Sequence, residues 1–303
     1  MSMPKYAIIS ELHANWAAFF EVYKSIKQNK EIRDIVCLGD IVGYGPEPNE
    51  VIHSLRQMEQ RGYRVQYNLG SHDAAALGMF VFISLRDEAD IKRVKNESGL
   101  ENEEEIIQAY HDLDTRRYIP VRPEAKAAMD WTLKTLTNES RNFMRTRMVL
   151  RIMLKEGVVC VHASIRDPIF EYVRDARCAQ RCFESEEMEN QKVCFVGHTH
   201  FPVIWRVPRE ARMSYAGNVV LVSEPECIFD THHRLETDTY RYIVNVGAVG
   251  QPRDGDARAC YVIYDSDADT VTYVRLDYEV TKTQQKILRA GLPAQLAERL
   301  SAE

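Results

Sequence analysis

Short apolar runs alternate with helix-like stretches along the first 73 residues. The apolar runs at 5–10, 34–40 and 63–70 predict buried β-strands, and the segments between them predict helices from Asn15 to about Lys27 and from about Pro48 to Gln60. This β-α-β-α-β order is typical of a sheet whose strands are joined by helical crossovers. In such a sheet, the loops at the carboxyl ends of the strands carry the functional side chains.

The pattern changes after the first third of the chain. A helical pattern at about 123–146 is followed by seven apolar, strand-like runs, at 147–154, 157–164, 192–200, 203–207, 241–250, 257–265 and 271–278. The stretch between Pro208 and Thr239 is polar and irregular, and the tail at 282–300 is an amphipathic helix broken at Gly291 and Pro293. We expect an α/β (α+β) fold, in which each half of the chain contributes one of two mixed β-sheets packed as a sandwich and flanked by helices.

One segment departs from this pattern. Residues 86–117 are dense in charge and offer few positions that could face a core. A charged helical insert or cap at about 84–120, made of one or two solvated helices, accounts for this composition, and a role as a lid stays open. The chain has no internal repeat and no low-complexity linker, so we expect residues 1–303 to form a single domain.

Composition narrows the class of protein. With 303 residues of which 45% are hydrophobic, the chain can bury a full core. A formal net charge of −6 without a long basic run argues against stable nucleic-acid binding. The longest apolar stretch, 74–83, is too short to span a membrane and no signal-like segment opens the sequence, so we expect a cytoplasmic protein without a membrane partner. The odd count of seven cysteines favours buried, reduced thiols, and the oligomeric state stays open.

Acidic residues and histidines that could bind a ligand follow the ends of the predicted strands. Five of the nine histidines lie there, each beside a glycine, an alanine or a turn. The five places are Glu11-x-His13, Gly39-Asp40, Gly70-Ser71-His72-Asp73, Val161-His162 and Gly197-His198-Thr199-His200. A single histidine after a strand is more often a structural residue, but carboxylates and imidazoles repeated in this way suit Zn, Fe, Mn or Co. The joint pattern predicts a metal site at the carboxyl ends of the strands.

The same series resembles a known family. Its order is that of the calcineurin-like metallophosphoesterase superfamily, whose motifs run D-x-H, G-D, G-N-H-D/E, H and G-H-x-H. The stretches GDIVGYGPEPNEV, VHASIRDP, FVGHTHFP and NVGAVGQPRDGDARACYVIYD resemble a bacterial, phosphodiesterase-like branch, and the likeness runs from Tyr6 to about Asp265. The resemblance implies a phosphodiesterase or phosphomonoesterase, acting on a small phosphorylated substrate such as a nucleotide. It implies two divalent metal ions (Mn, Fe, Zn, Co or Ni) and direct attack on phosphorus by a hydroxide that bridges them.

The resemblance also implies a ligand for each ion. Asp40 would bridge the two ions. Glu11, His13 and His200 would complete one site, and Ser71, His162 and His198 would complete the other.

The resemblance further implies roles for residues that bind no metal. His72 would donate a hydrogen bond or a proton toward the phosphate or the leaving group, and Asp73 would orient it. Arg253 could hold a substrate phosphate, although an ion pair with the neighbouring acids explains it equally well. Tyr44, in the loop after Asp40, and the charged insert are candidates for substrate specificity.

Two positions depart from the family pattern. Glu11 stands where the motif has Asp, and Ser71 stands where it has Asn. Glu11 keeps the charge with one more methylene, whereas the Ser71 hydroxyl is shorter than an Asn amide. We therefore expect one ion to bind firmly and the other more weakly. The alternative is an attenuated relative that binds a nucleotide or a protein and acts as a regulator.

Overall fold

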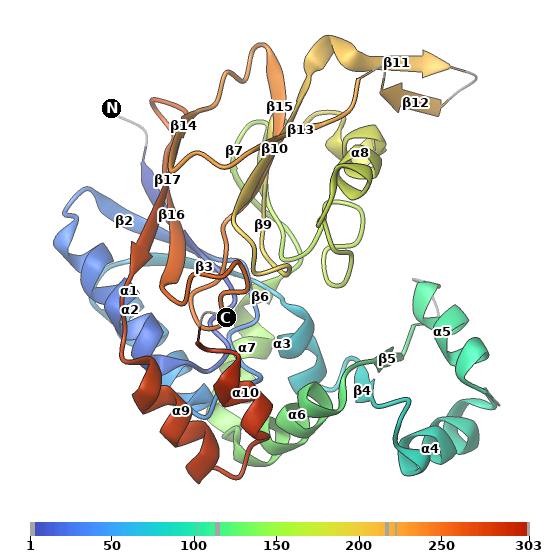
Figure 1. The fold of residues 1–303 in the computed structure, drawn as a ribbon. Helices are drawn as coiled ribbons and strands as arrows, with labels where there is room; N and C mark the ends of the chain where they lie inside the picture. Colours follow the sequence, from blue (N-terminus) through green and yellow to red (C-terminus); the bar gives the residue numbers. More distant parts are fainter. Residues whose placement is uncertain (1–3, 101, 113–115, 216–217, 222, 302–303) are drawn as a thin grey trace.

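The computed structural model describes residues 4–301 apart from 101, 113–115, 216–217 and 222 (Figure 1). Most of its strands form two sheets. One sheet holds β1 (Lys5–Ile9), β2 (Ile32–Cys37), β3 (Arg64–Asn68), β6 (Met148–Val149), β14 (His232–Arg234), β16 (Ala259–Asp265) and β17 (Thr270–Leu276). The other holds β7 (Ile152–Lys155), β8 (Val158–Cys160), β9 (Val193–Val196), β10 (Val203–Pro208), β13 (Glu226–Ile228) and β15 (Tyr240–Asn245).

Both sheets mix parallel and antiparallel pairs. The first has the order β14-β17-β16-β1-β2-β3-β6 and the second has the order β13-β10-β15-β9-β8-β7. In the first sheet, β1, β2, β3 and β6 run parallel, which confirms the predicted helical crossovers. In the second, β8, β9 and β15 run parallel. The carboxyl ends of both parallel sets can therefore face a common site.

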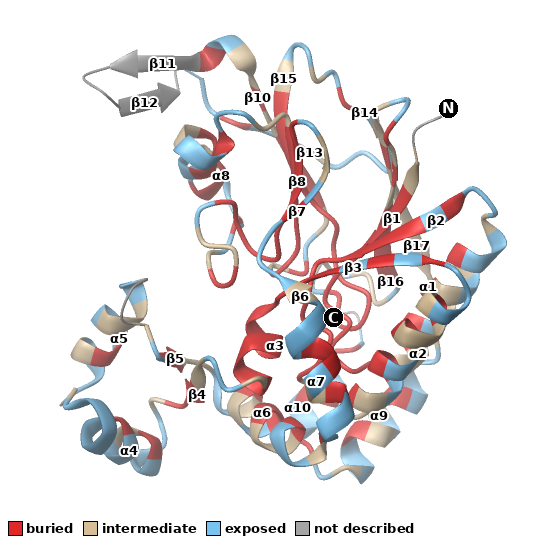
Figure 2. Ribbon diagram, turned by 180° about the vertical axis from the view of Figure 1, so that it is seen from behind, coloured by how far each residue is buried: buried red, intermediate tan, exposed pale blue. Residues whose placement is uncertain are grey.

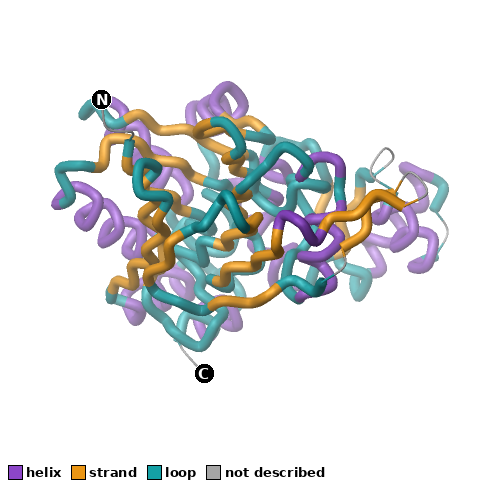
Figure 3. The backbone as a smooth tube through the Cα atoms, turned by 90° about the horizontal axis from the view of Figure 1, so that it is seen from above, coloured by secondary structure: helices purple, strands orange, loops and turns teal. Residues whose placement is uncertain are grey.

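Helices flank the strands, as the view from above shows (Figure 3). In the body of the protein they are α1 (Trp16–Gln28), α2 (Pro48–Gln60), α3 (Ser71–Ala76), α6 (Pro123–Thr135), α7 (Asn138–Arg147), α8 (Ala176–Glu184), α9 (Val280–Arg289) and α10 (Ala294–Glu298). The predicted helix at 123–146 is thus two helices, because Thr137 starts α7 by accepting a hydrogen bond from the Ser140 amide. The predicted break in the tail lies between α9 and α10, where Gly291 has a φ of 72°.

Side chains alternate across each strand, and this alternation builds the sandwich. In β1, Tyr6 and Ile8 point between the two sheets, where Phe195 of the second sheet meets them. Ala7 and Ile9 point to the opposite face, where α1 and α2 cover the first sheet. Both faces of the central strands are therefore buried, as Figure 2 shows, which explains why their sequences are continuous apolar runs.

Two expectations about the sheets are wrong. The halves of the chain do not supply one sheet each, because β16 lies antiparallel beside β1 and brings β17 with it. The predicted strand at 147–154 is two strands: β6 pairs with β3 in one sheet and β7 pairs with β8 in the other. The polar stretch between Pro208 and Thr239 also holds strands, namely β11 (Arg212–Tyr215), β12 (Asn218–Leu221), β13 and β14.

The charged insert forms a small unit of its own. It consists of α4 (Glu88–Ser98) and α5 (Glu103–His111), and it is joined to the body by the parallel strands β4 (Val81–Ile83) and β5 (Tyr118–Pro120). Figure 1 shows these helices standing away from the sheets. Ile83, Val94, Ile106 and Tyr118 form its buried core. Two helices are therefore confirmed here, while residues 101 and 113–115 of the predicted insert lie outside the described part of the chain.

No helix in the described part of the chain is both long enough and apolar enough to cross a bilayer.

Asn15 joins the start of α1 to two distant segments, and its loss should destabilise the fold. Its side-chain oxygen accepts hydrogen bonds from the Ala18 amide and the Thr283 hydroxyl, and its side-chain nitrogen donates to the Gly250 carbonyl. We predict that Asn15→Ala lowers the free energy of unfolding by about 2 kcal/mol, because it removes a helix cap and leaves buried polar groups without partners. Chemical denaturation followed by circular dichroism measures this change.

Asn102→Ala is the matched control, because Asn102 caps α5 on the exposed insert by accepting from the Glu105 amide. Its cost should be about 0.5 kcal/mol. Equal costs for the two variants would contradict the role given to Asn15.

Candidate metal centre

Every predicted metal ligand lies in one buried region between the two sheets. The loops after β1 and β2 bring Glu11, His13 and Asp40 from the first sheet, and the start of α3 after β3 brings Ser71. Loops after β8 and β9 bring His162, His198 and His200 from the second. Within the described residues, three groups have ligand atoms close enough to hold a cation. They are Glu11, His13 and His200; His13, Asp40 and His72; and Asp40, His162 and His198.

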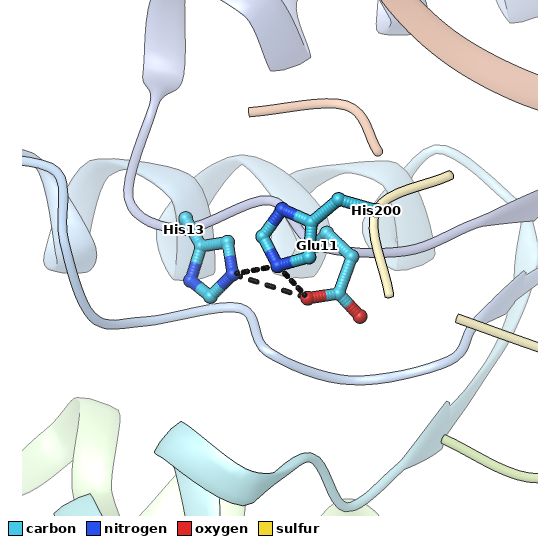
Figure 4. Close-up of side chains that lie close together, drawn as sticks. All are labelled: Glu11, His13 and His200. Carbon is cyan, nitrogen blue, oxygen red and sulfur yellow. Dashed lines mark hydrogen bonds and ion pairs between the residues drawn. The ribbon is translucent and has the colours of Figure 1, made fainter. Parts of the chain in front are cut away.

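The first group is centred on one carboxylate oxygen of Glu11 (Figure 4). Its Oε2 lies 3.1 Å from Nε2 of His13 and 3.0 Å from Nε2 of His200. The two imidazole nitrogens are 3.3 Å apart. Glu11 therefore reaches His13 and His200 in spite of its additional methylene.

Asp40 lies between this first group and the pair His162 and His198. Its Oδ2 is 3.8 Å from Nε2 of His13 and 3.6 Å from Nε2 of His162. On the far side, Nε2 of His162 is 3.1 Å from Nδ1 of His198. The Asp40 carboxylate is thus the group best placed to contact two neighbouring ions.

Backbone carbonyl groups fix the tautomer of four histidines. A carbonyl oxygen can only accept, so the ring nitrogen beside it must carry the proton. His13 donates through Nδ1 to Val42, His162 through Nδ1 to Leu38, His198 through Nε2 to Phe170, and His200 through Nδ1 to Gln251, over 2.6–3.2 Å. The remaining nitrogen of each ring then presents a lone pair to the centre, as metal-ligating histidines do.

This arrangement fits divalent cations. Lone pairs that face one another at 3.1–3.3 Å repel unless a positive charge lies between them. Burial lowers the pKa of His13 and His162 and brings that of His200 to about 3, so these rings are neutral, as a metal ligand must be. Burial and the charges of Glu11 and Asp73 raise the pKa of Asp40, whose ionised form needs a nearby cation.

The backbone is strained where the ligands lie. Glu11, His13, Asp40, His198 and His200 all have φ between 45° and 62°, a region that side chains other than glycine seldom adopt. Two glycines make room for this geometry. A Cβ atom on Gly70 would lie 2.1 Å from the Asp40 amide nitrogen, and one on Gly197 would lie 2.9 Å from Glu11 Oε1. Strain concentrated in this way is typical of functional sites.

Ser71, His72 and Asp73 follow β3 at the start of α3, where they have different partners. The Ser71 hydroxyl donates to Oδ2 of Asp40 over 3.2 Å, and the His72 amide donates to Oδ1 over 2.8 Å. The His72 ring lines the site, and its buried Nδ1 has no hydrogen-bond partner among the described residues. Burial holds the pKa of His72 well below its usual value.

Asp73 supports the backbone around Asp40. Its carboxylate accepts hydrogen bonds from the amides of Ile41, Val42 and Gly70 over 3.0–3.3 Å, and burial raises its pKa to about 7. This differs from the expectation that Asp73 orients the His72 ring. The structure instead places Asp73 behind the loop that carries Asp40.

Arg253 and Tyr44 lie at the entrance of the centre. Arg253 donates to the side-chain oxygen of Gln251 over 3.0 Å, and its guanidinium carbon is 5.8 Å from the centre of the Tyr44 ring. The two acids that follow Arg253 bind other arginines, since Asp254 pairs with Arg275 and Asp256 pairs with Arg258. The structure therefore does not support the ion pair considered as the alternative explanation for Arg253.

A cavity of about 790 Å³ opens above the centre. Ser71, His72 and His198 line its floor, and Arg253 and Tyr44 line one side. Its other walls come from the charged insert, a predicted contributor to substrate specificity, and from the 170–172 loop and the end of the chain, which no sequence pattern indicates. These walls include Phe82, Tyr110, Ile119, Phe170, Tyr172 and Arg299.

Comparison with known proteins agrees with this geometry. Residues 5–269 match the calcineurin-like phosphoesterase superfamily domain. The crystal structure of a metallophosphoesterase from Sphaerobacter thermophilus is similar, with 32% identity, 99% of each chain covered and a TM-score of 0.68. The uncharacterized protein MJ0912 of Methanocaldococcus jannaschii is 29% identical over 97% of this chain and 96% of its own. The protein PH1004 of Pyrococcus horikoshii OT3 shares the fold at 16% identity, with 99% and 98% of the two chains covered and a TM-score of 0.67. The chain belongs to the calcineurin-like phosphoesterase superfamily.

Proposed function

We propose that this protein is a dimetal-dependent phosphoesterase that hydrolyses a phosphodiester or a phosphomonoester of a small molecule, such as a nucleotide. The observation that carries the proposal is the position of Asp40 between two groups of ligands, next to Ser71 and His72, which line a large cavity. A cavity of about 790 Å³ is the size of a small-molecule site.

The ligand groups divide between two ions. Glu11, His13 and His200 would hold one, and His162 and His198 would hold the other, with Asp40 shared. Two divalent ions, when bound, supply Lewis-acid stabilisation of a phosphoryl group and lower the pKa of a water nucleophile. Mn, Fe, Zn, Co and Ni all suit imidazole and carboxylate ligands.

Other side chains would bind the substrate. His72 faces the cavity as a neutral ring, so it can donate a hydrogen bond to a phosphate oxygen. Arg253 carries a positive charge that is free of the neighbouring acids, and its planar group suits a phosphate. The organic part of the substrate would lie against the aromatic wall that includes Phe82 and Tyr172.

Metal-dependent turnover tests this function directly. We predict that metal-stripped protein is inactive toward bis(4-nitrophenyl) phosphate and 4-nitrophenyl phosphate, and that titration with Mn²⁺, Ni²⁺, Co²⁺ or Zn²⁺ restores hydrolysis of at least one of them. Asp40→Asn should lower kcat/KM by about a hundredfold or more, because the shared ligand loses its charge. Release of nitrophenolate at each metal concentration measures both effects.

The matched control is Asp267→Asn, which makes the same change at an exposed turn far from the centre. It should retain full activity. An unsubstituted protein that binds metal yet hydrolyses neither ester would support the attenuated, regulatory alternative instead.

Arg253→Gln should weaken substrate binding more than the chemical step. We predict that KM rises about tenfold while kcat falls less, because the charge that would hold the phosphate is lost and the metal ligands remain. Steady-state kinetics with the preferred ester measure the two constants. Arg64→Gln, in which an exposed arginine at the start of β3 loses its pair with Asp34, is the control and should change neither. An unchanged KM in Arg253→Gln would exclude Arg253 from substrate binding.

Ser71→Asn should strengthen the binding of the ion held by Asp40, His162 and His198. The Ser71 hydroxyl is directed to Asp40, whereas an Asn carbonyl at the same position reaches further into the cavity that Ser71 already lines. We predict that the weaker Mn²⁺ dissociation constant falls about tenfold in isothermal titration calorimetry, with little change in the tighter one. Two equally tight ions in the unsubstituted protein would show that Ser71 costs no affinity.

A further inference from the structure

The end of the charged insert is tied to the body by a buried arginine. The Arg116 side chain is only 7% exposed and its guanidinium pairs with Asp167 over 2.8 Å. Its Nε donates to the Tyr110 carbonyl over 2.7 Å. The guanidinium also stacks on the rings of Tyr110 and Phe170, at 5.0 and 4.9 Å from their centres. A charge buried with this many partners holds the surrounding groups in one arrangement.

Asp167 passes this constraint to the turn that follows it. One carboxylate oxygen accepts from Arg116, and the other accepts from the amides of Ile169 and Phe170, each over 3.2 Å. The same turn is hydrogen-bonded to the segment after His162, because the Ala163 amide donates to the Pro168 carbonyl over 3.0 Å. Asp167 thus sets the conformation of residues 167–170.

The last residue of the turn, Phe170, is hydrogen-bonded to the candidate metal ligand His198. The Phe170 carbonyl accepts a hydrogen bond from His198 Nε2 over 3.1 Å, which leaves the lone pair of Nδ1 facing His162. If the Phe170 carbonyl moved, His198 would lose the partner that fixes its tautomer. A continuous series of contacts therefore joins Arg116, outside the centre, to the nitrogen that would bind an ion.

We propose that Arg116, acting through Asp167 and the Phe170 carbonyl, is a positioning residue that fixes His198 as a ligand and so couples the charged insert to the ion site of Asp40, His162 and His198. The consequence for metal binding rests on the proposed two-ion function, whereas the effect on the His198 ring does not. Glu11 contacts the backbone amide of His198 and not its ring, and no hydrogen bond or ion pair joins His13 or His200 to this series within the described residues, so the other ion should depend on it far less. Partners that hold a ligating histidine in this way typically change metal affinity by 10–100-fold.

Two variants break the series at different points. Arg116→Ala removes the buried cation, and Asp167→Asn removes the charge pair while its side-chain oxygen can still accept from the turn amides. Arg117→Ala is the matched control, because Arg117 is the neighbouring arginine, is 63% exposed and contacts Glu97 on the insert. Circular dichroism establishes that each variant is folded.

The first readout needs neither metal nor activity. In metal-free protein with ¹⁵N-labelled histidine, long-range ¹H–¹⁵N NMR should show His198 as the Nε2–H tautomer. Arg116→Ala and Asp167→Asn should shift this ring to a mixture of tautomers, while Arg117→Ala leaves it unchanged. A His198 ring with the same tautomer in all four proteins would overturn the proposal.

The second readout is Mn²⁺ binding by isothermal titration calorimetry. Arg116→Ala and Asp167→Asn should weaken one of two ions by tenfold or more and leave the other within about twofold. Equal weakening of both ions, or of neither, would contradict the proposal. If the unsubstituted protein takes up only one ion, the two-ion function fails, and the NMR readout still decides whether Arg116 positions His198.

Discussion

Electrostatic repulsion among buried lone pairs is the constraint on which the rest of this structure depends. Four imidazole rings each donate a hydrogen bond from their only N–H to a backbone carbonyl, and their other nitrogens meet in pairs at 3.1–3.3 Å. The carboxylates of Glu11 and Asp40 lie against the same nitrogens. Such a group of acceptors is stable only around positive charge, so the protein is built for cations that its own side chains do not supply.

The fold meets this constraint by closing one sheet on the other. Glu11, His13 and Asp40 follow strands of the first sheet, and His162, His198 and His200 follow strands of the second. The apolar layer between the sheets brings the two sets of loops together. Cations held by ligands from both sheets would cross-link the sandwich, so metal binding and sheet packing should stabilise each other.

Local sequence patterns predict β1, β2 and β3 with their helical crossovers, and they place the candidate ligands together at the ends of strands. Acids and histidines mark the ends of β1, β2, β3, β8 and β9, and a glycine accompanies them after β2, β3 and β9. The position of β16 beside β1 could not be predicted in this way, because pairing between distant strands leaves no local signal. The role of the Phe170 carbonyl was also missed, since any residue offers a backbone oxygen. The expectation that Asp73 orients His72 rests on their being sequence neighbours, whereas the Asp73 carboxylate accepts hydrogen bonds from three backbone amides.

The two departures from the family pattern are not equivalent in the folded protein. The two carboxylate oxygens of Glu11 have different partners. Oε2 faces His13 and His200, while Oε1 accepts a hydrogen bond from the His198 amide over 2.7 Å. Gly197 leaves the space that this carboxylate occupies. Glu11 is therefore accommodated, and it connects the two groups of ligands through the backbone of His198. Ser71 has no such compensation, because its hydroxyl donates to Asp40 and gives no additional oxygen to the centre. The substitution at position 71, rather than the one at position 11, is the one that should limit metal binding.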